Sequence, residues 1–156
     1  MSRLSHVNQE GSIQMVDVGG KPATLRRAIA EGFLLIKSSH REALGKLPKG
    51  DALLTAQVAG IQGGKRTSDL IPLCHPLPLS KLDVRLSVEG DKIRIEAEAE
   101  TTAQTGVEME AYTAVAIAGV TLIDMLKGVD PDLTLTDIRL LEKTGGKAPW
   151  KRASGS

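Results

Sequence analysis

A histidine between two prolines is the first feature of this sequence that suggests chemistry. His75 follows Cys74 and lies between Pro72 and Pro76 in the segment SDLIPLCHP. Prolines restrict the backbone, and histidine is the side chain most easily tuned for proton transfer near neutral pH. A buried, hydrogen-bonded histidine in a rigid turn is the plainer interpretation. Because the chain has one cysteine, Cys74 and His75 supply at most two ligands of a tetrahedral site, and no metal site is predicted.

Charged residues lie at both ends of a long apolar segment, VEMEAYTAVAIAGVTLIDMLK (107–127). Glu108 and Glu110 open it, where the simpler role of a carboxylate is to interact with the helix dipole. Asp124 and Lys127 are three residues apart near its end, so they share one side of a helix. An acid on such an apolar helix is costly unless paired, so the pair is either a structural salt bridge or a functional pair with perturbed pKa values.

The length of this helix constrains any site that uses both of its ends. Glu110 and Asp124 are fourteen residues apart, which is roughly 21 Å along a helix axis. A small substrate cannot easily contact both within one subunit, so we predict a dimer or larger oligomer with a shared site. On this reasoning, mixing a subunit that lacks Asp124 with one that lacks Lys49 restores some activity.

Glycine-lysine clusters recur along the chain and suit a phosphorylated ligand, because glycines expose backbone N–H groups and lysine adds positive charge. None is a P-loop, since Gly60 to Lys65 is one residue short and Arg66 replaces the required Ser or Thr. Each cluster alone is more often a solvated turn. The clusters are Gly19-Gly20-Lys21, Pro48-Lys49-Gly50, Gly63-Gly64-Lys65 and Gly145-Gly146-Lys147.

The hydrophobic pattern predicts the elements that must position these groups. Alternating apolar residues indicate strands over 82–88 and 93–99, joined by a turn at Gly90-Asp91. Residues 25–37 fit a helix or a buried strand, and we interpret them as a strand because a two-layer fold needs one there. Residues 107–127 form the strongest helix, and 133–141 a last strand.

Two shorter helices are predicted between the first strand and the hairpin. Ser39 is the expected N-cap of one, and Asp51 of the other. In the second, Leu54, Val58 and Ile61 follow at helical spacing and form an apolar stripe.

These elements predict an α+β fold in the order β-α-α-β-β-α-β, which is a ferredoxin-like antiparallel sheet with helices packed on one face. The chain of 156 residues is expected to form a single domain over 1–156. Its polar ends, about 1–14 and about 148–156, are expected to be flexible.

Composition argues against several classes of partner. The net charge is +1 and aromatic residues make up 2%, whereas nucleic-acid binders usually carry a basic excess or aromatic stacking platforms. No continuous apolar run reaches the roughly 18 residues of a membrane span, and the N-terminus has no secretory pattern. With one cysteine, the sequence predicts a cytoplasmic protein that binds neither nucleic acid nor membrane.

Five segments together resemble the MoaC family of molybdenum cofactor biosynthesis, the cyclic pyranopterin monophosphate synthases. The resemblance covers essentially the whole chain, and the longer motifs are specific. The segments are MVDVGGK (15–21), KGD (49–51), KRTSDLIPLCHPLPLSKLDV (65–84), TGVEMEAYTAVAIAGVTLIDMLKGVD (105–130) and RLLEKTGGK (139–147).

The resemblance implies a lyase that acts on 3′,8-cyclo-7,8-dihydroguanosine 5′-triphosphate. The reaction opens the imidazole ring of the purine, rebuilds it as a pterin, closes a cyclic phosphate and expels diphosphate. The family pattern also implies a homohexamer, a trimer of dimers, with active sites at the dimer interface. No cofactor is required on this reading, and a divalent cation on the substrate phosphates stays open.

The resemblance also assigns roles to individual residues. Asp124 matches the catalytic aspartate, with Lys127 one turn further on and Lys49 in the loop KGD. Leu73, Cys74 and His75 match the substrate-binding triplet. The remaining residues implied to bind substrate are Glu108, Met109, Glu110 and, for the phosphates, Lys21, Arg26, Lys65 and Lys147.

Two other functions stay open beside this one. A ferredoxin-like nucleotide-binding module without catalysis would bind a ligand and release no product. A metal-dependent nucleotide hydrolase using Cys74 and His75 would lose its activity on chelation.

Overall fold

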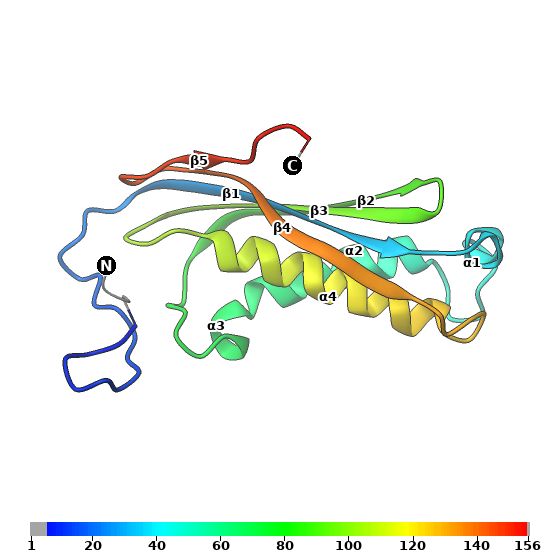
Figure 1. Cartoon of the computed structure of the whole chain (residues 1–156), viewed down its shortest axis with the longest axis horizontal. Helices are drawn as coiled ribbons and strands as arrows, with labels where there is room; N and C mark the ends of the chain where they lie inside the picture. Colours follow the sequence, from blue (N-terminus) through cyan, green and yellow to red (C-terminus); the bar gives the residue numbers. More distant parts are fainter. Residues whose placement is uncertain (1–5, 156) are drawn as a thin grey trace.

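Five strands form one antiparallel sheet in the computed structural model, which describes residues 6–155 (Figure 1). The strands lie side by side in the order β2-β3-β1-β4-β5. Because β1 and β3 are central, with β2 and β4 beside them, the first four strands have the ferredoxin-like arrangement, and the predicted α+β class is confirmed. The strand bounds are β1 Thr24–Leu35, β2 Leu79–Glu89, β3 Lys92–Ala103, β4 Thr134–Thr144 and β5 Trp150–Lys151.

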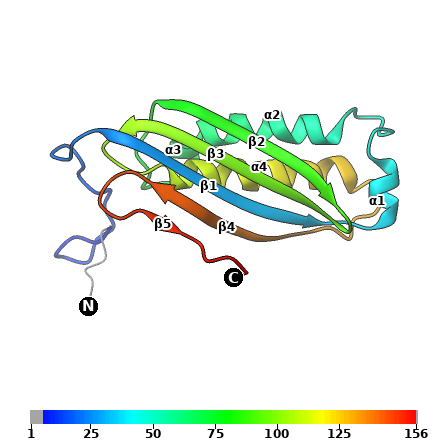
Figure 2. The ribbon, with the colours of Figure 1, turned by 90° about the horizontal axis from the view of Figure 1, so that it is seen from above.

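The helices lie on one side of the sheet, as predicted (Figure 2). Helix α2 runs beside β2, and α4 runs beneath β1 and β3. The structure adds the short helix α3 and the strand β5 to the predicted order. The helix bounds are α1 Ser38–Ala43, α2 Ala52–Lys65, α3 Thr67–Leu70 and α4 Glu108–Leu126.

Strand β1 is the central element, because it pairs with both β3 and β4. Its alternation places Ala28, Ala30 and Leu34 in the core under the helices. Gly32 is required on the same face, since a Cβ there would lie 2.8 Å from Cγ1 of Val115 on α4. The ambiguous segment is therefore a strand whose small residues let α4 approach closely.

Helix α4 confirms the predicted helix and forms the centre of the core. Val115, Ala118, Leu122 and Leu126 are completely buried. Among the described residues α4 alone is long and apolar enough to cross a membrane, but most of it is packed inside the protein, so it is a core helix.

Helix α2 packs on α4 mainly through small residues, and Ile61 is the one residue of the predicted apolar stripe that packs against the core. Asp51 caps α2 as predicted, its Oδ1 accepting from the N–H of Leu54 at 3.0 Å. Leu54 and Val58, however, are about half exposed. The buried face consists of Ala52, Ala56, Gly60, Gly63 and Gly64.

Glycine is needed at this contact because the helices approach too closely for larger side chains. A Cβ on Gly60 would lie 2.9 Å from the carbonyl oxygen of Ala114, and one on Gly63 would lie 2.6 Å from Ile117. Leu54 and Val58 therefore face away from the core, and the described chain does not cover them, whereas Leu53 and Ile61 are partly buried against the core.

Helix α1 differs from the prediction at its first turn. Its N-cap is Lys37, not Ser39, and the reason is the side chain of His40. His40 is fully buried, and its Nδ1 accepts from the Lys37 N–H at 3.0 Å. Its Nε2–H donates to the carbonyl of Asp130 at 2.7 Å, so this histidine ties α1 to the loop after α4.

The ends of the chain are only partly described. Residues 1–5 and 156 of the expected flexible ends lie outside the described residues. In the C-terminal segment, Trp150 and Lys151 form β5, which pairs with Lys143 and Glu142 of β4. The mobility of both ends stays a prediction.

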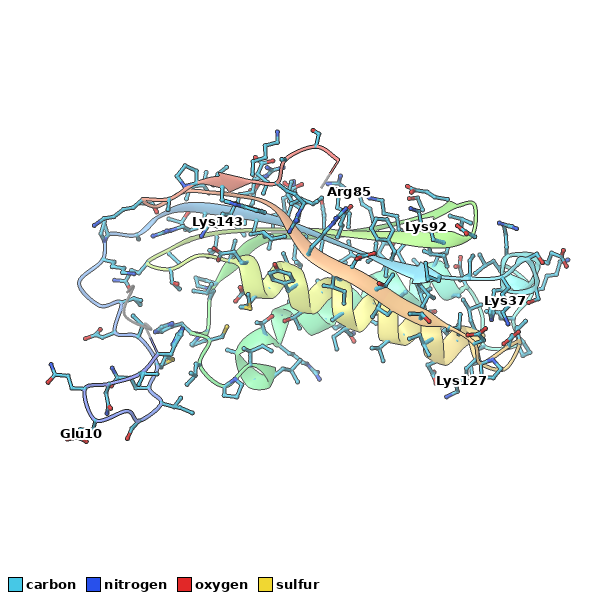
Figure 3. All side chains as sticks on the ribbon, viewed as in Figure 1. Glu10, Lys37, Arg85, Lys92, Lys127 and Lys143 are labelled. Carbon is cyan, nitrogen blue, oxygen red and sulfur yellow. The ribbon has the colours of Figure 1, made fainter. Side chains whose placement is uncertain are left out.

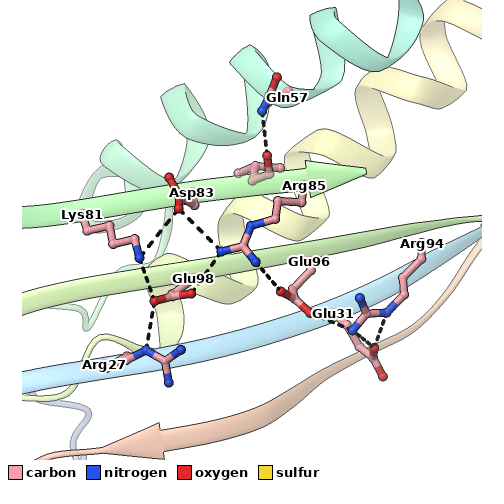
Figure 4. Close-up of polar contacts among 10 residues, drawn as sticks. Arg27, Glu31, Gln57, Lys81, Asp83, Arg85, Arg94, Glu96 and Glu98 are labelled. Carbon is pink, nitrogen blue, oxygen red and sulfur yellow. Dashed lines mark hydrogen bonds and ion pairs between the residues drawn. The ribbon is translucent and has the colours of Figure 1, made fainter. Parts of the chain in front are cut away.

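The face of the sheet opposite the helices carries a network of ion pairs (Figure 4). Glu98 is nearly buried there, and Arg27, Lys81 and Arg85 donate to its carboxylate at 2.9 to 3.2 Å. The hydrogen bond from Arg27, followed by that from Lys81, lowers the pKa of Glu98 to about 2. Glu31 has a similar position on this face, where Arg94 and Arg139 donate to its two carboxylate oxygens at 2.9 Å each.

Candidate functional site

The histidine loop and the start of α4 form one cavity of about 290 Å³. This volume is near the lower end of the range of small-molecule sites. The sequence separates the two motifs by more than thirty residues, and the fold joins them because α3 directs the following loop against α4. The predicted residues that line this cavity are Lys21, Leu73, Cys74, His75, Glu108, Met109 and Glu110.

The His75 ring, carried by the proline-flanked loop, is held in place by a hydrogen bond from one of its two nitrogens. Nε2 lies 2.7 Å from the carbonyl oxygen of Val16, to which it donates. In the neutral ring the proton is then on Nε2, and Nδ1 is left as an acceptor facing no described protein donor. His75 is half-buried, so the ring is oriented and still accessible from the cavity.

Glu110 is the most perturbed acid in this cavity. The residue is 4% exposed, and its carboxylate accepts a hydrogen bond from its own backbone N–H, which lowers the pKa by less than burial raises it. Burial raises its pKa to about 7, with a smaller contribution from the charge of Glu108. Such a carboxyl exchanges its proton near neutral pH, which is the property expected of a functional acid.

Cys74 and Glu108 have plainer environments. Burial, then the charges of Glu110 and Glu108, raise the pKa of the Cys74 thiol. The protonated thiol is a poor nucleophile and a poor metal ligand. Glu108 is paired with Lys143 at 3.1 Å, so it is held at the mouth of the cavity as an ion pair.

A second cavity of about 750 Å³ adjoins the first and is rich in positive charge. The two share Lys21, Thr105, Gly106 and Glu108 as a common wall. Lys21, Arg26 and Lys147, each predicted to contact phosphate, all line this second cavity. We call it the cationic cavity.

The loop Gly145-Gly146 closes one side of the cationic cavity and requires glycine at both positions. The φ angles are +92° and +70°, which side chains rarely adopt. A Cβ on Gly145 would collide with the carbonyl of Leu25, and one on Gly146 with the guanidinium of Arg26. The two glycines therefore let the loop lie directly against Arg26 and place Lys147 at the same cavity.

The predicted catalytic residues form a third group at the other end of α4. Lys127 Nζ lies 2.6 Å from Asp124 Oδ1, and Lys49 Nζ lies 3.5 Å from Asp124 Oδ2. The hydrogen bond from Lys127, its charge and then that of Lys49 lower the pKa of Asp124. The predicted pairing of Asp124 with Lys127 is therefore present, but the side chains are 55% to 57% exposed and not embedded in apolar surroundings.

This third group lines neither cavity, because α4 separates it from them. Figure 3 shows Lys127 at one end of the helix layer and Lys143 near the other. The helix is continuous from Glu108 to Leu126, so the predicted separation along its axis holds. Within one chain, His75 and Asp124 do not meet on a common ligand.

The contact between Lys49 and Asp124 also corrects the proposed mixing experiment. Both belong to one cluster of the same subunit. A subunit that lacks one residue cannot be rescued by a subunit that lacks the other, because every cluster in the mixture would be defective.

Lys65 is the predicted phosphate contact that the fold does not bring to the others. It ends α2, is exposed, and lines neither cavity. The preceding Gly63 and Gly64 pack on α4 and Leu82, so this triplet is a helix-packing feature and not an anion loop.

Several cavity residues were not predicted. His6, Val16 and Val18 line the histidine cavity, and Thr24 and Arg27 line the cationic cavity. The apolar alternation Met15-Val16-Asp17-Val18 was the available signal for an extended segment packed on the site. Among residues 6–155, no group of three His, Cys, Asp or Glu is arranged to hold a metal ion.

Comparison with known proteins gives a consistent result over nearly the whole chain. The MoaC family matches residues 15–146. A cyclic pyranopterin monophosphate synthase of Streptomyces avermitilis is 53% identical over 154 residues, covering 97% of this chain and 91% of the relative. The enzymes of that name from Corynebacterium glutamicum strain R and Oleidesulfovibrio alaskensis are each 52% identical, covering 95% and 97% of this chain and 96% and 98% of the relatives.

Proposed function

This chain belongs to the MoaC family and is an enzyme of the cyclic pyranopterin monophosphate synthase type. We propose that it converts 3′,8-cyclo-7,8-dihydroguanosine 5′-triphosphate to cyclic pyranopterin monophosphate and diphosphate. The observation that carries this proposal is the convergence of two distant motifs, around His75 and around Glu110, on one cavity beside a cationic one. A cavity that offers His75 and Glu110 as hydrogen-bonding groups, next to a cavity rich in lysine and arginine, suits a ligand with a heterocycle and a polyphosphate.

The two cavities divide the substrate between them in this proposal. The heterocycle lies in the histidine cavity, where His75 Nδ1 and Glu110 exchange hydrogen bonds or protons with it. The triphosphate lies in the cationic cavity, where Lys21, Arg26 and Lys147 stabilise the leaving diphosphate. Asp124 and Lys127 act as a proton-transfer pair, and Lys49 is a general acid or stabilises developing phosphate charge.

These groups act together only if a second subunit supplies the Asp124 cluster. The outward side of the helix layer supports such an assembly, since Leu54 and Val58 of α2 and Val120 of α4 are about half exposed. Val120 and Asp124 are four residues apart and share one side of α4. Covering the apolar residues with a second copy would bury the surroundings of the cluster. We propose a dimer with a shared site, within a hexamer of three dimers.

Mixed subunits test the shared site directly. Co-expression of an Asp124→Asn chain with a His75→Ala chain is expected to restore about a quarter of wild-type activity, because half of the random dimers are mixed and each has one intact site. Asp124→Asn with Lys49→Ala is the matched negative control, since both changes fall in one cluster. Activity in the control, or none in the first mixture, contradicts the arrangement.

Turnover by the purified protein tests the function. Incubation with the cyclised nucleotide is expected to release one diphosphate for each pterin product, measured by a coupled diphosphate assay and chromatography. Binding without release would favour the non-catalytic nucleotide-binding module. We propose a cytoplasmic enzyme that needs no cofactor, so turnover is expected to survive chelation of divalent cations, which a metal-dependent hydrolase would not.

A further inference from the structure

One acid lies among the positive charges of the cationic cavity. Among the described residues that line this cavity, Glu108 is the only one with a carboxylate, and it also lines the histidine cavity. A negative charge beside a bound polyphosphate repels it. The presence of Glu108 at a cavity that suits an anion therefore requires an explanation.

The partner of Glu108 comes from the sheet. Lys143 Nζ lies 3.1 Å from Glu108 Oε1, and within residues 6–155 this is the one ion pair that either side chain forms. Lys143 of β4 lies opposite Ala28 of β1. Since paired residues of antiparallel strands share a face of the sheet and Ala28 is buried under the helices, Lys143 lies on the helix side. The pair therefore links β4 to the first turn of α4 (Figure 3).

The Glu108 carboxylate is confined from a second side by Gly106. A Cβ on Gly106 would collide with Oε2 of Glu108, so the carboxylate lies folded back over this glycine. Gly106 belongs to the common wall of the two cavities. The side chains of Lys143 and Glu108 are 36% and 23% exposed, so water screens their attraction less than that of a fully exposed pair. Lys143 and Gly106 together fix the carboxylate at the common wall.

The cations that line the cationic cavity fall into two groups. Arg27 lies within 3.7 Å of three carboxylates on the opposite face of the sheet, and Lys143 is paired with Glu108. In the part of the chain that the structure describes, no acid lies within ion-pair distance of the other three, which are Lys21, Arg26 and Lys147. Lys143 therefore compensates the acid of this cavity, and the other three cations are left for an anion.

We propose that Lys143 is a positioning residue that holds Glu108 at the common wall and neutralises its charge, so that a polyphosphate can bind in the cationic cavity. Without Lys143, the carboxylate would be an uncompensated negative charge on the same wall as Lys21, where it would repel the anion and compete with it for that lysine. The identification of the anion with the triphosphate of the cyclised nucleotide rests on the proposed function. The role of Lys143 itself rests on the ion pair and the cavity.

Two variants that break the same ion pair test this role, because their expected effects on anion binding differ. Lys143→Gln is expected to bind inorganic tripolyphosphate about tenfold more weakly by titration calorimetry, since Glu108 is left uncompensated. Glu108→Gln is expected to bind it at least as tightly as wild type, since the repelling charge is removed. Lys143→Arg keeps the charge and is expected to restore most of the affinity. If the pair served only to link α4 to β4, both glutamine variants would bind equally weakly, and that result would overturn the proposal.

The double variant separates a positioning role from direct contact with the anion. Because Lys143 acts through Glu108 in this proposal, Lys143→Gln in the Glu108→Gln background is expected to change the affinity by about twofold or less. A tenfold loss in both backgrounds would mean that Lys143 binds the anion directly, and it would overturn the proposal. Lys151→Gln, on the exposed strand β5, is the matched control for the loss of one positive charge and is expected to keep wild-type affinity. An equal loss in Lys151→Gln and Lys143→Gln would also overturn it.

The wild-type protein completes the test. Wild-type protein that binds no tripolyphosphate would overturn the proposal, because Lys143 would then have no anion site to protect. The expected pattern of tripolyphosphate affinities without turnover of the cyclised nucleotide would reject the proposed function and leave the role of Lys143 intact.

Discussion

Replacing Asp124 with asparagine is expected to reduce product formation by about a thousandfold or more while substrate binding and assembly remain. Asp124 is ionised between the ammonium groups of Lys127 and Lys49, at 2.6 and 3.5 Å. Asparagine keeps the shape but neither accepts a proton nor holds both cations. Because the side chain is largely exposed, the folded state loses little. The measurements are single-turnover product formation and calorimetric binding of the cyclised nucleotide.

Asp130→Asn is the matched control for this prediction. Asp130 lies beyond the same end of α4, pairs with Lys37 at 2.9 Å, and also has a lowered pKa because Lys37 donates to it. It lies outside the proposed catalytic cluster, is less exposed than Asp124 (30% against 56%), and also accepts from the N–H of Asp132. We expect wild-type turnover in this variant. Equal losses in both variants would indicate that the aspartates act through local structure, and wild-type turnover in Asp124→Asn would remove Asp124 from the mechanism.

The sheet and the long helix could be predicted because their patterns are local. Ile93, Ile95, Ala97 and Ala99 alternate in the sequence and are fully buried in β3. The orientation of α2 could not be predicted in this way, because the rule that large apolar residues face the core fails for two of the four in this helix. Gly60, Gly63 and Gly64 face α4 because only small residues allow its approach, and Leu54 and Val58 are left outside.

The site was predictable in its residues but not in its grouping. The motifs identified Cys74, His75 and Glu110, and the fold joins them in one cavity. The exposure of Asp124 depends on where α4 ends relative to the sheet, which no spacing in the sequence specifies. His40, which has polar neighbours in the sequence, is buried because the Asp130 carbonyl reaches it from ninety residues away.

Glutamine at position 110 is expected to make the protein more stable and less active. The pKa of Glu110 is about 7 in the folded protein, raised chiefly by burial from an ordinary value of 4.5. The folded state therefore binds this proton more tightly than the unfolded chain. The resulting stabilisation is complete below pH 4.5 and is lost as pH rises through 7. At pH 8 the Glu110→Gln variant avoids ionising a buried acid, so its unfolding free energy is expected to exceed that of wild type by roughly 3 kcal/mol.

The activity of the same variant is expected to change in the opposite direction. Its kcat/KM for the cyclised nucleotide is expected to fall about ten- to hundredfold, because the amide cannot replace a carboxyl that bonds the heterocycle.

Glu98→Gln is the control for the predicted change in stability. The pKa of Glu98 is lowered to about 2, so its stabilisation is present above pH 4.5 and lost as pH falls through 2. That variant should therefore be less stable than wild type at pH 8. Chemical denaturation between pH 4 and 8 measures both differences. A Glu110→Gln protein that gains no stability at high pH would mean that the carboxyl is solvated or paired, and it would then have no special capacity to exchange a proton with the substrate near pH 7.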